Sequence, residues 1–430
     1  MMYSIIFLLL FLIFFELNNI VFKKKNNFLN IFWVVFFAVI LLSEINIYSF
    51  REVKPIVYIY LTISIVFIEI DSLLLYKLKI RSKFIKNNED KENNKILNNK
   101  MLTILSIVTL LMMLPQTFTG LKIIKTQGFS MLRTLILTEE LFKGNIRLLQ
   151  YYLLSPLSKA IALYSIFDLV KNKKFRLHFL FSMINIVQIS LLSAGRSSVF
   201  EFLIFAIIIM MEVYNMKILK LVKNNKKIVF ACVLLVLFLM GVTSQRKLSS
   251  NTNFFENIYA YFVGSLSLIS IHLGNVEQSL LDGSHLLFGK GMLSPFFDIF
   301  KIFIKFIGID TNMKTGVQII NEVTQNFYYV SSNIKMNNNV TFLYTCLRDF
   351  GIFGLYIGPL YISLIYTKFA KMYEKYQKDC YKIAYYYLLS LIPYFIFFFP
   401  FANTPTFMLF VLIFLVYKIT YKKEGNGDVK

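Results

Sequence analysis

The chain has 430 residues, of which 57% are hydrophobic and 17% aromatic, while only 16% are charged. A soluble globular protein carries about 25% charged residues, so this composition excludes an ordinary soluble enzyme and predicts a chain that lies largely in a lipid bilayer. The net charge of +22 would suggest nucleic-acid binding in a soluble protein. Here most lysines form short clusters between apolar runs, as cytoplasmic loops do, so we expect no nucleic-acid partner.

Apolar runs of membrane-spanning length recur along the chain and predict an all-α polytopic membrane protein with about 11 transmembrane helices. The first run follows no basic segment and has no small-residue cleavage site, so we expect a retained span and not a signal peptide. The runs lie at about 3–22, 28–48, 55–76, 101–119, 151–170, 177–194, 198–216, 228–244, 340–366, 383–400 and 404–421.

The basic clusters set the expected orientation of these helices. If residues 23–25 are cytoplasmic, alternation puts every strongly basic loop on the same side, as the positive-inside rule requires. The N-terminus is then external and the tail 422–430 cytoplasmic. The helices fall into two groups, 1–244 and 340–421, separated by a large external loop at 245–339, and a medium external loop covers about 120–150.

Both external loops contain apolar segments. In the large loop, residues 262–273 and 296–309 are apolar with scattered polar positions, which predicts helices that lie on or dip into the outer leaflet. In the medium loop, the segment from Ser130 to Gly144 fits a capped interfacial helix. The large loop, with some ninety-five residues, is far longer than an ordinary connecting loop.

A tight turn between two apolar runs is the sharpest candidate site on the expected external side. The guanidinium of Arg196, with the N–H groups around Gly195 and Ser197 where the next helix begins, suits a phosphate oxyanion. The alternative is an interfacial arginine that snorkels or pairs with Glu201. Three other external arginines could complete a phosphate site or be ordinary interfacial charges: Arg133, Arg147 and Arg246.

The helix that follows the large loop carries two adjacent charges, Arg348 and Asp349. Charges inside a membrane cost about 2.5–3.5 kcal/mol each on insertion scales, so we expect these two to face an aqueous cavity or a partner, with a structural ion pair as the alternative. In the large loop, His272, Asp282 and His285 are candidate general bases near neutral pH. A solvated histidine without a catalytic role is the simpler interpretation of each.

The sequence contains neither a phosphate-binding P-loop nor an external Asp-x-Asp pair, and its three cysteines lack metal-ligand spacing. We therefore expect no nucleotide, metal or other cofactor, and a substrate that arrives already activated in the membrane. Three titratable residues are expected to play no part in the chemistry: Glu69 and Asp71 at the inner interface, and His178 beside a basic inner loop.

Several short motifs occur together with the large external loop. They are the turn Ala194-Gly195-Arg196-Ser197, the stretch Leu287-Phe288-Gly289-Lys290-Gly291, and the helix entry Asn339-x-Thr341 leading to Asp349-Phe350-Gly351-x-x-Gly354. With these features the chain resembles the oligosaccharide repeat-unit polymerases of Wzy type, the O-antigen or capsular polysaccharide polymerases. The resemblance covers nearly the full length in layout and implies a C-type glycosyltransferase-like architecture.

The resemblance implies glycosyl transfer on the outer face of a bacterial plasma membrane, from undecaprenyl pyrophosphate to a hydroxyl of another lipid-linked repeat unit. It implies the bilayer, these lipid-linked oligosaccharides, a flippase and a chain-length regulator as partners. Arg196 would bind the donor pyrophosphate with help from the other external arginines. Asn339, Thr341, Arg348 and Asp349 would shape the substrate cavity.

Two alternatives stay open. O-antigen ligases, which transfer finished chains to another acceptor, typically have a histidine near the end of the large loop, where this chain has Asn339. That difference favours a polymerase and leaves the general base unassigned. A lipid-linked oligosaccharide flippase is the main non-enzyme alternative, and the large external loop argues against it because a transporter would not need one.

Overall fold

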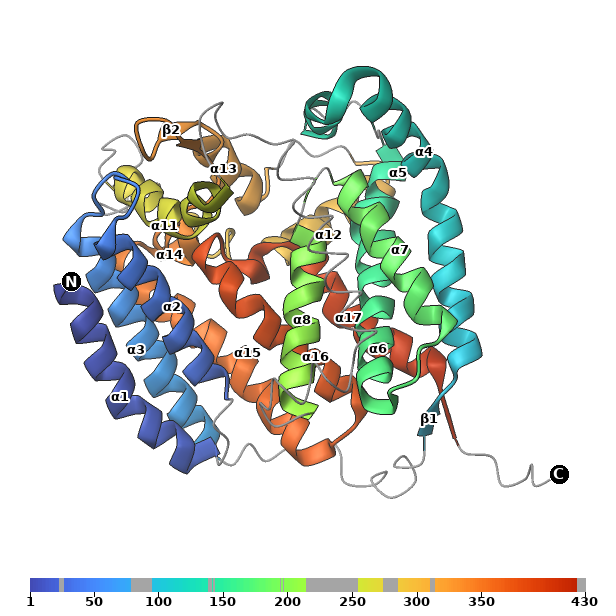
Figure 1. Ribbon diagram of the computed structural model, residues 1–430, viewed down its shortest axis with the longest axis horizontal. Coiled ribbons are helices and arrows are strands. Elements are labelled where there is room, and N and C mark those ends of the chain that lie inside the picture. The colour runs from blue at the N-terminus through green and yellow to red at the C-terminus, as the bar shows by residue number, and fades with distance from the viewer. Residues whose placement is uncertain are drawn as a thin grey trace. The chain divides into compact units, whose positions relative to one another are not determined.

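The computed structural model describes residues 1–22, 27–78, 95–137, 141, 144–193, 195, 197–213, 254–273, 285–309 and 314–423. The chain forms two compact units. Unit 1 comprises Met1–Leu78, Lys247–Lys371 and Leu391–Thr404, and unit 2 comprises Lys79–Arg246, Met372–Ser390 and Pro405–Lys430. The fold is all-helical (Figure 1), and the described strands form only two short antiparallel pairs.

Unit 1 begins with three apolar helices that pack side by side (Figure 1): α1 (Met2–Phe22), α2 (Phe28–Ile45) and α3 (Pro55–Lys77). The Asn27 side chain caps α2 by accepting a hydrogen bond from the Asn30 N–H at 2.9 Å, and Pro55 opens α3 at a position that needs no N–H donor. Helices are expected here because lipid offers no partner for exposed backbone groups.

The remaining elements of unit 1 come from the predicted large loop and the last third of the chain. They are α11 (Phe254–Leu273), α12 (Ser294–Phe306), α13 (Gly316–Thr324), β2 (Tyr328–Tyr329), β3 (Lys335–Met336), α14 (Thr341–Phe350), the 3-10 turn η3 (Gly351–Phe353), most of α15 (Gly354–Tyr376), η4 (Ile392–Ile396) and η5 (Pro400–Ala402). The segment predicted at 262–273 is helical within α11, and the segment predicted at 296–309 is helical as far as Phe306, where α12 ends. Their position at the outer leaflet stays a prediction.

Aromatic rings fill the interior of unit 1. Phe32 packs on Phe395 and Tyr366, and Phe342 packs on both Phe36 and Phe395, with ring centroids 5.4–5.8 Å apart. Lipid is as apolar as these side chains, so burial as such does not drive the helices together. Close packing of the rings stabilises the unit instead, at about 0.5–1.5 kcal/mol per aromatic pair.

Glu69 lies in the interior of unit 1, and its expected position near the inner interface of the membrane stays a prediction. Its side chain is fully buried, and its Oε2 accepts hydrogen bonds from Trp33 Nε1 at 2.9 Å and Asn18 Nδ2 at 3.3 Å. Asp71 is also buried. Asn18 of α1 and Trp33 of α2 supply the donors that the Glu69 carboxylate needs away from water.

Unit 2 contains a long helix and a packed group of shorter ones. Its elements are β1 (Lys95–Leu97), α4 (Asn99–Leu137), α5 (Gly144–Leu149), a π-helical turn η1 (Gln150–Leu154), α6 (Ser155–Asn172), α7 (Leu177–Leu192), α8 (Ser197–Val213), most of α16 (Asp379–Leu391), most of α17 (Thr404–Thr420) and β4 (Tyr421–Lys423). Helix α7 packs against α4 and α6. Strand β1 pairs with β4.

Much of the predicted medium loop is helical. The helix expected at 101–119 continues as α4 to Leu137, interrupted by a kink where Gly128 has φ of +83°. Only glycine adopts such a conformation at little cost, so the kink falls at this residue. The segment after the kink corresponds to the short helix predicted from Ser130, although it ends seven residues before the predicted end at Gly144.

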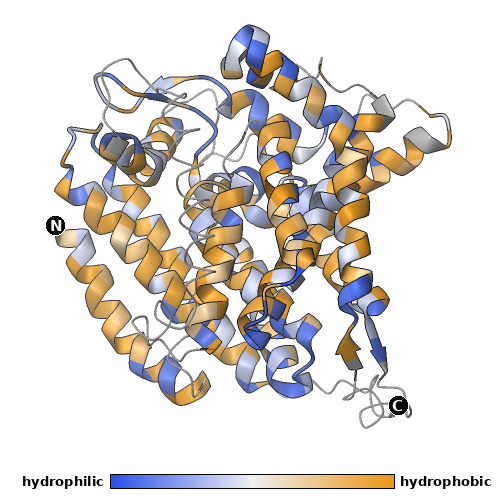
Figure 2. Ribbon diagram, turned by 45° about the vertical axis from the view of Figure 1, so that its right-hand side comes forward, coloured by the Kyte–Doolittle hydropathy of each residue, from blue (hydrophilic) through white to orange (hydrophobic). Residues whose placement is uncertain are grey.

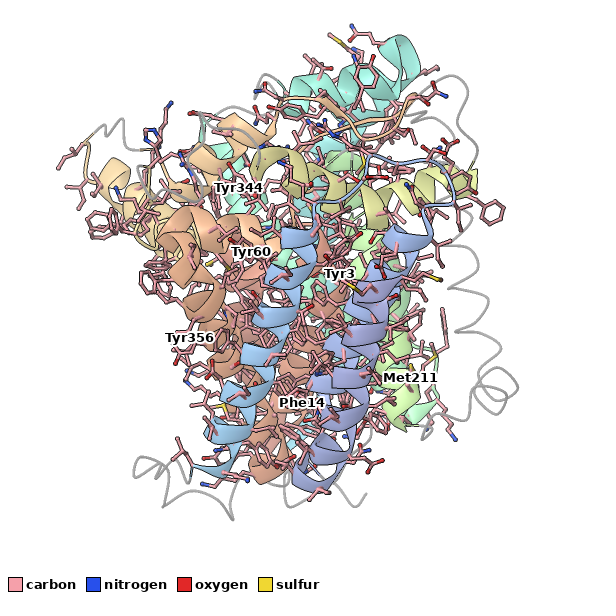
Figure 3. All side chains as sticks on the ribbon, turned by 90° about the vertical axis from the view of Figure 1, so that its left-hand side faces the viewer. Tyr3, Phe14, Tyr60, Met211, Tyr344 and Tyr356 are labelled. Atoms are coloured by element: carbon pink, nitrogen blue, oxygen red, sulfur yellow. The ribbon has the colours of Figure 1, made fainter. Side chains whose placement is uncertain are left out.

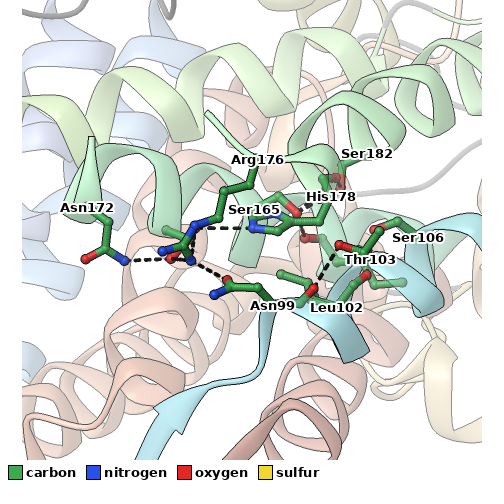
Figure 4. A network of polar contacts seen from close by, with 11 residues as sticks. Asn99, Leu102, Thr103, Ser106, Ser165, Asn172, Arg176, His178 and Ser182 are labelled. Carbon is green, nitrogen blue, oxygen red and sulfur yellow. Dashed lines mark hydrogen bonds and ion pairs between the residues drawn. The ribbon is translucent and has the colours of Figure 1, made fainter. Parts of the chain in front are cut away.

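A charged network holds α6, α7 and the start of α4 together (Figure 4). Asp168 is buried and accepts hydrogen bonds from Asn172 at 2.6 Å and from Arg176 at 3.1 Å, while His178 Nε2 lies 3.2 Å from it. Arg176 also donates to Asn99. The predicted bystander His178 therefore belongs to a buried structural network, in which each charge has a partner.

Six described helical stretches are long and apolar enough to cross a membrane. They are Met2–Phe22, Phe28–Ile45, Pro55–Lys77, Asn99–Phe129, Ile146–Asn172 and Thr341–Tyr376, with shorter apolar helices at Leu177–Leu192 and Thr404–Thr420. Hydrophobic residues cover long stretches of the helices (Figure 2). The chain is thus a multi-pass membrane protein. The run expected at 228–244 lies outside the described residues.

The run predicted as one span at 340–366 is two helices. Helix α14 ends at Phe350, η3 follows, and α15 begins at Gly354. Gly351 has φ of +59°, and a Cβ on Gly354 would lie 2.0 Å from the Cys346 carbonyl oxygen. These two glycines allow the chain to turn sharply at the point where it leaves α14.

Candidate functional site

The segment 287–292 is fastened to the end of α14, and we call this arrangement the latch. The buried Asp349 carboxylate accepts hydrogen bonds from the Gly291 N–H at 2.8 Å and the Met292 N–H at 2.6 Å. The N–H groups of Leu287 and Phe288 donate to the carbonyls of Arg348 and Asp349, each at 3.0 Å. A carboxylate that accepts two backbone donors has the partners that its burial requires.

Two glycines let the latch approach its neighbours closely. A Cβ on Gly291 would lie 2.8 Å from Asp349 Oδ1 and 3.0 Å from Ile320 of α13. A Cβ on Gly316, the first residue of α13, would lie 2.1 Å from the Lys290 carbonyl oxygen. Any larger residue at either position would force backbone or side chains apart. The latch is therefore held between α13 and α14 by direct backbone contact.

The latch joins two of the motifs that the sequence singled out. Leu287-Phe288-Gly289-Lys290-Gly291 and Asp349-Phe350-Gly351 lie far apart in the chain but are joined by two hydrogen bonds, from the Phe288 and Gly291 N–H groups to Asp349. Asp349 was expected to face a cavity or a partner, and its partners are these backbone groups. Arg348 and Asp349 consequently have different surroundings, as expected for neighbours on a helix, which point about 100° apart.

A polar face of α14 lies beside the latch. Thr341, Tyr344 and Arg348 recur at spacings of three and four, so they share one side of the helix. The Thr341 Oγ1 and the Tyr344 hydroxyl are buried and have no hydrogen-bond partner among the described residues. An unmade hydrogen bond costs about 1–3 kcal/mol, so these two hydroxyls are suited to a polar ligand. Tyr344 lies toward the end of unit 1 that holds Tyr3 and Tyr60 (Figure 3).

His272 is the candidate base that the structure brings to this face. It lies in the last turn of α11 and is 1% exposed. Its ring packs edge-on against Tyr344 and Tyr328, with centroids 5.3 Å and 5.2 Å away. His285 instead is exposed, two residues before the latch. Asp282 lies outside the described residues.

Asn339 lies just before α14, where its N–H donates to the Asn337 carbonyl at 2.8 Å. Thr341 follows with φ of +59°, a left-handed conformation that is strained for a β-branched residue. The predicted cavity residues Asn339, Thr341, Arg348 and Asp349 are thus gathered at one helix. Backbone strain held at such a position is a feature that functional sites often show.

The predicted pyrophosphate ligands belong to unit 2, and the structure describes four of them. The Gly195 N–H donates to the Ser190 carbonyl at 3.0 Å, and Ser197 begins α8. Arg133 is exposed on α4, and Arg147 lies on α5. Arg196 and Arg246 lie outside the described residues. The arginine clamp therefore stays a prediction.

Glu201, the alternative partner for Arg196, is engaged by another residue. Lys159 Nζ lies 2.6 Å from Glu201 Oε2, and both side chains are mostly buried. The ion pair links α6 to α8. The sequence did not predict this pair, because the two residues are 42 positions apart.

Sequence reasoning missed Tyr344, whose hydroxyl is central to the polar face. The signal was present, since Tyr344 precedes Arg348 by one helical turn. Among the described residues, no group of three His, Cys, Asp or Glu side chains is placed to hold a metal ion.

Comparisons with known proteins give no relative for this chain: no family model, no curated protein and no solved structure matches it. The fold defines an all-helical multi-pass membrane protein. In it, the segment 287–292 is held against the end of α14 by hydrogen bonds.

Proposed function

We propose that the protein polymerises undecaprenyl-pyrophosphate-linked oligosaccharide repeat units into a surface polysaccharide on the outer face of a bacterial plasma membrane. The observation that supports it most is the latch: two motifs on which the resemblance to Wzy-type polymerases rests meet through Asp349, beside the buried polar face of α14. The proposal includes about 11 spans, with the N-terminus outside and the C-terminus inside.

The reaction needs three things from the protein. The acceptor hydroxyl must be aligned with the anomeric carbon of the donor sugar, its proton must be taken up, and the negative charge on the leaving pyrophosphate must be stabilised. The oxygen of the hydroxyl bonds to the anomeric carbon while the bond to the pyrophosphate oxygen breaks, and the pyrophosphate departs with the electron pair.

Residues of unit 1 are suited to the first two tasks. The Thr341 and Tyr344 hydroxyls would bind sugar hydroxyls, and His272 beside Tyr344 would accept the proton. Arg348 lies one turn from Tyr344 on the same face. Asp349 would keep the latch in place and not touch the substrate. For the third task the sequence predicts Arg196, with Arg133, Arg147 or Arg246, because guanidinium forks suit a pyrophosphate.

The test is a reconstituted assay in proteoliposomes with lipid-linked repeat units, read as a glycan ladder on a gel. Tyr344→Phe keeps the ring but removes the hydroxyl, and His272→Gln removes the base. His272→Gln should lower the polymerisation rate at least about 100-fold, because general base catalysis contributes about 10²–10⁴-fold. Tyr344→Phe should lower it about tenfold, because it removes one hydrogen bond to the sugar. His285→Gln, a substitution of an exposed histidine, is the matched control and should retain the rate.

If both Tyr344→Phe and His272→Gln polymerise at the wild-type rate, the polar face of α14 takes no part in the mechanism. In cells, deletion of the gene should collapse the surface glycan ladder to a single repeat unit. Complete loss of surface glycan would indicate a flippase instead, and long chains that accumulate on the lipid without transfer would indicate a ligase.

A further inference from the structure

One face of α1 carries a regular row of exposed side chains. Its members recur at alternating spacings of four and three residues, and the apolar ones are 44–70% exposed. This spacing is the heptad repeat, with which two helices pack against each other along one seam. We call this row the α1 stripe, and it consists of Met2, Ile6, Leu9, Ile13, Glu16 and Ile20.

The opposite face of α1 attaches the helix to unit 1. Phe7 and Phe14 pack on Trp33 of α2, with ring centroids 4.6 Å and 5.6 Å away. Leu9 and Glu16 of the α1 stripe each lie two residues further along the chain, which is about 200° around the helix. The α1 stripe therefore points away from α2, and α1 lies at the edge of the three-helix group (Figure 1).

Glu16 is the polar member of the α1 stripe. Helix α1 has 21 residues and spans about 30 Å, the thickness of the hydrocarbon core, with Glu16 about 9 Å before its end at Phe22. Because side chains on a helix tilt toward its N-terminus, this carboxyl group is directed toward the middle of the bilayer and not toward the nearer surface. It is exposed and forms no hydrogen bond or ion pair with the described residues. A carboxyl group in lipid is costly, so it calls for a partner on another molecule.

A second copy of this chain offers that partner. Copies insert in the membrane in one orientation, so two α1 helices related by a two-fold axis run parallel, and each residue of the α1 stripe faces its own counterpart. Two neutral Glu16 carboxyl groups then satisfy each other, because each O–H donates to the carbonyl oxygen of the other. The neutral form is expected because two carboxylates would repel each other. Hydrogen bonds between helices contribute to helix association in lipid.

The apolar residues of the α1 stripe favour two parallel helices. In heptad numbering the isoleucines Ile6, Ile13 and Ile20 occupy the a positions, while Leu9 and Glu16 occupy d positions. Isoleucine at a with leucine at d favours two-stranded parallel packing in coiled coils. A basic residue on a helix of another protein would match the charge of Glu16, but it leaves this choice of a and d residues unexplained.

We propose that α1 is the interface of a parallel homodimer, in which the α1 stripes of two copies pack together and their Glu16 carboxyl groups hydrogen-bond to each other. The interface includes no residue of the latch or of the polar face of α14. The proposal concerns association only, and it holds whichever reaction the protein performs.

The experiment measures association of the full-length protein in vesicles of phosphatidylcholine and phosphatidylglycerol, by energy transfer between copies that carry a donor or an acceptor at the C-terminus. The wild type should dimerise, with energy transfer that falls as the protein is diluted in lipid. Glu16→Leu should raise the dissociation constant about tenfold, because it removes two hydrogen bonds between the helices. Glu16→Gln should stay close to the wild type, because an amide both donates and accepts.

A matched pair of substitutions tests the packing along the α1 stripe. Ile13→Ala should raise the dissociation constant about fivefold, whereas Ile59→Ala, at a 46% exposed isoleucine of α3, should leave it unchanged. Leu9→Cys and Ile13→Cys should form covalent dimers on mild oxidation, and Ile59→Cys should not. The unsubstituted chain provides the background of the three native cysteines.

Thermal unfolding under dilute conditions, where the protein is monomeric, checks that Glu16→Leu is folded; its unfolding temperature should match the wild type, because Glu16 bonds to no described residue. A wild type that stays monomeric at every protein-to-lipid ratio would overturn the inference, as would a dimer that both Glu16→Leu and Ile13→Ala leave intact. A monomeric wild type whose Leu9→Cys variant cross-links to a different protein in cells would also overturn it, and would assign the α1 stripe to that protein.

Discussion

Replacing Asp349 by asparagine should release the latch. The Asp349 carboxylate is fully buried and accepts one N–H from Gly291 at 2.8 Å and one from Met292 at 2.6 Å. An asparagine can accept only one of these, and its NH₂ group would face the other donor. Loss of one charge-assisted hydrogen bond, with a buried donor left unpaired, should cost about 2–4 kcal/mol of local stability.

Amide hydrogen exchange measures this local cost directly. Because about 1.4 kcal/mol corresponds to a tenfold change in an equilibrium constant, the Gly291 and Met292 amides of Asp349→Asn should exchange about 30-fold to several hundred-fold faster than in the wild type. Amides of α1 and α3, elsewhere in unit 1, should keep their protection and serve as an internal control. Unchanged exchange at residues 291 and 292 would refute the view that this carboxylate holds the segment.

Three further predictions concern unit 1. Gly316→Ala should destabilise the protein by about 1–3 kcal/mol in thermal unfolding in detergent, because the added Cβ would lie 2.1 Å from a carbonyl oxygen. Trp33→Phe should cost about 1–3 kcal/mol, since Glu69 would lose its indole donor at 2.9 Å. An unchanged unfolding temperature would contradict the role of this hydrogen bond. Burial raises the pKa of Asp298, so this residue binds its proton more tightly in the folded state. Its contribution to stability should therefore fall as pH rises above about 4. In a series of melting temperatures, Asp298→Asn should become more stable relative to the wild type as the pH increases.

The helices could largely be predicted from the sequence, whereas their ends and breaks could not. Apolar runs identify helices because the backbone in lipid must satisfy its own hydrogen bonds, which is a local requirement. Gly351 and Gly354 mark the break between α14 and α15 in the sequence. The apolar run continues across them, however, so it predicts a single span. Likewise α4 continues beyond the predicted span, because apolar content falls before the helix ends.

Of the candidate site, the sequence singled out the short segments, and the tertiary structure decided which of them lie together. The Gly-Lys-Gly and Asp-Phe-Gly motifs are visible as patterns, but the bond between Gly291 and Asp349 joins residues 58 positions apart, and no periodicity encodes such a contact. Helix propensity, the length of an apolar run and the clustering of lysines between such runs depend on residues that are close together in the chain. The latch and the burial of Glu69 depend on which surfaces pack against one another, and only the folded chain sets that.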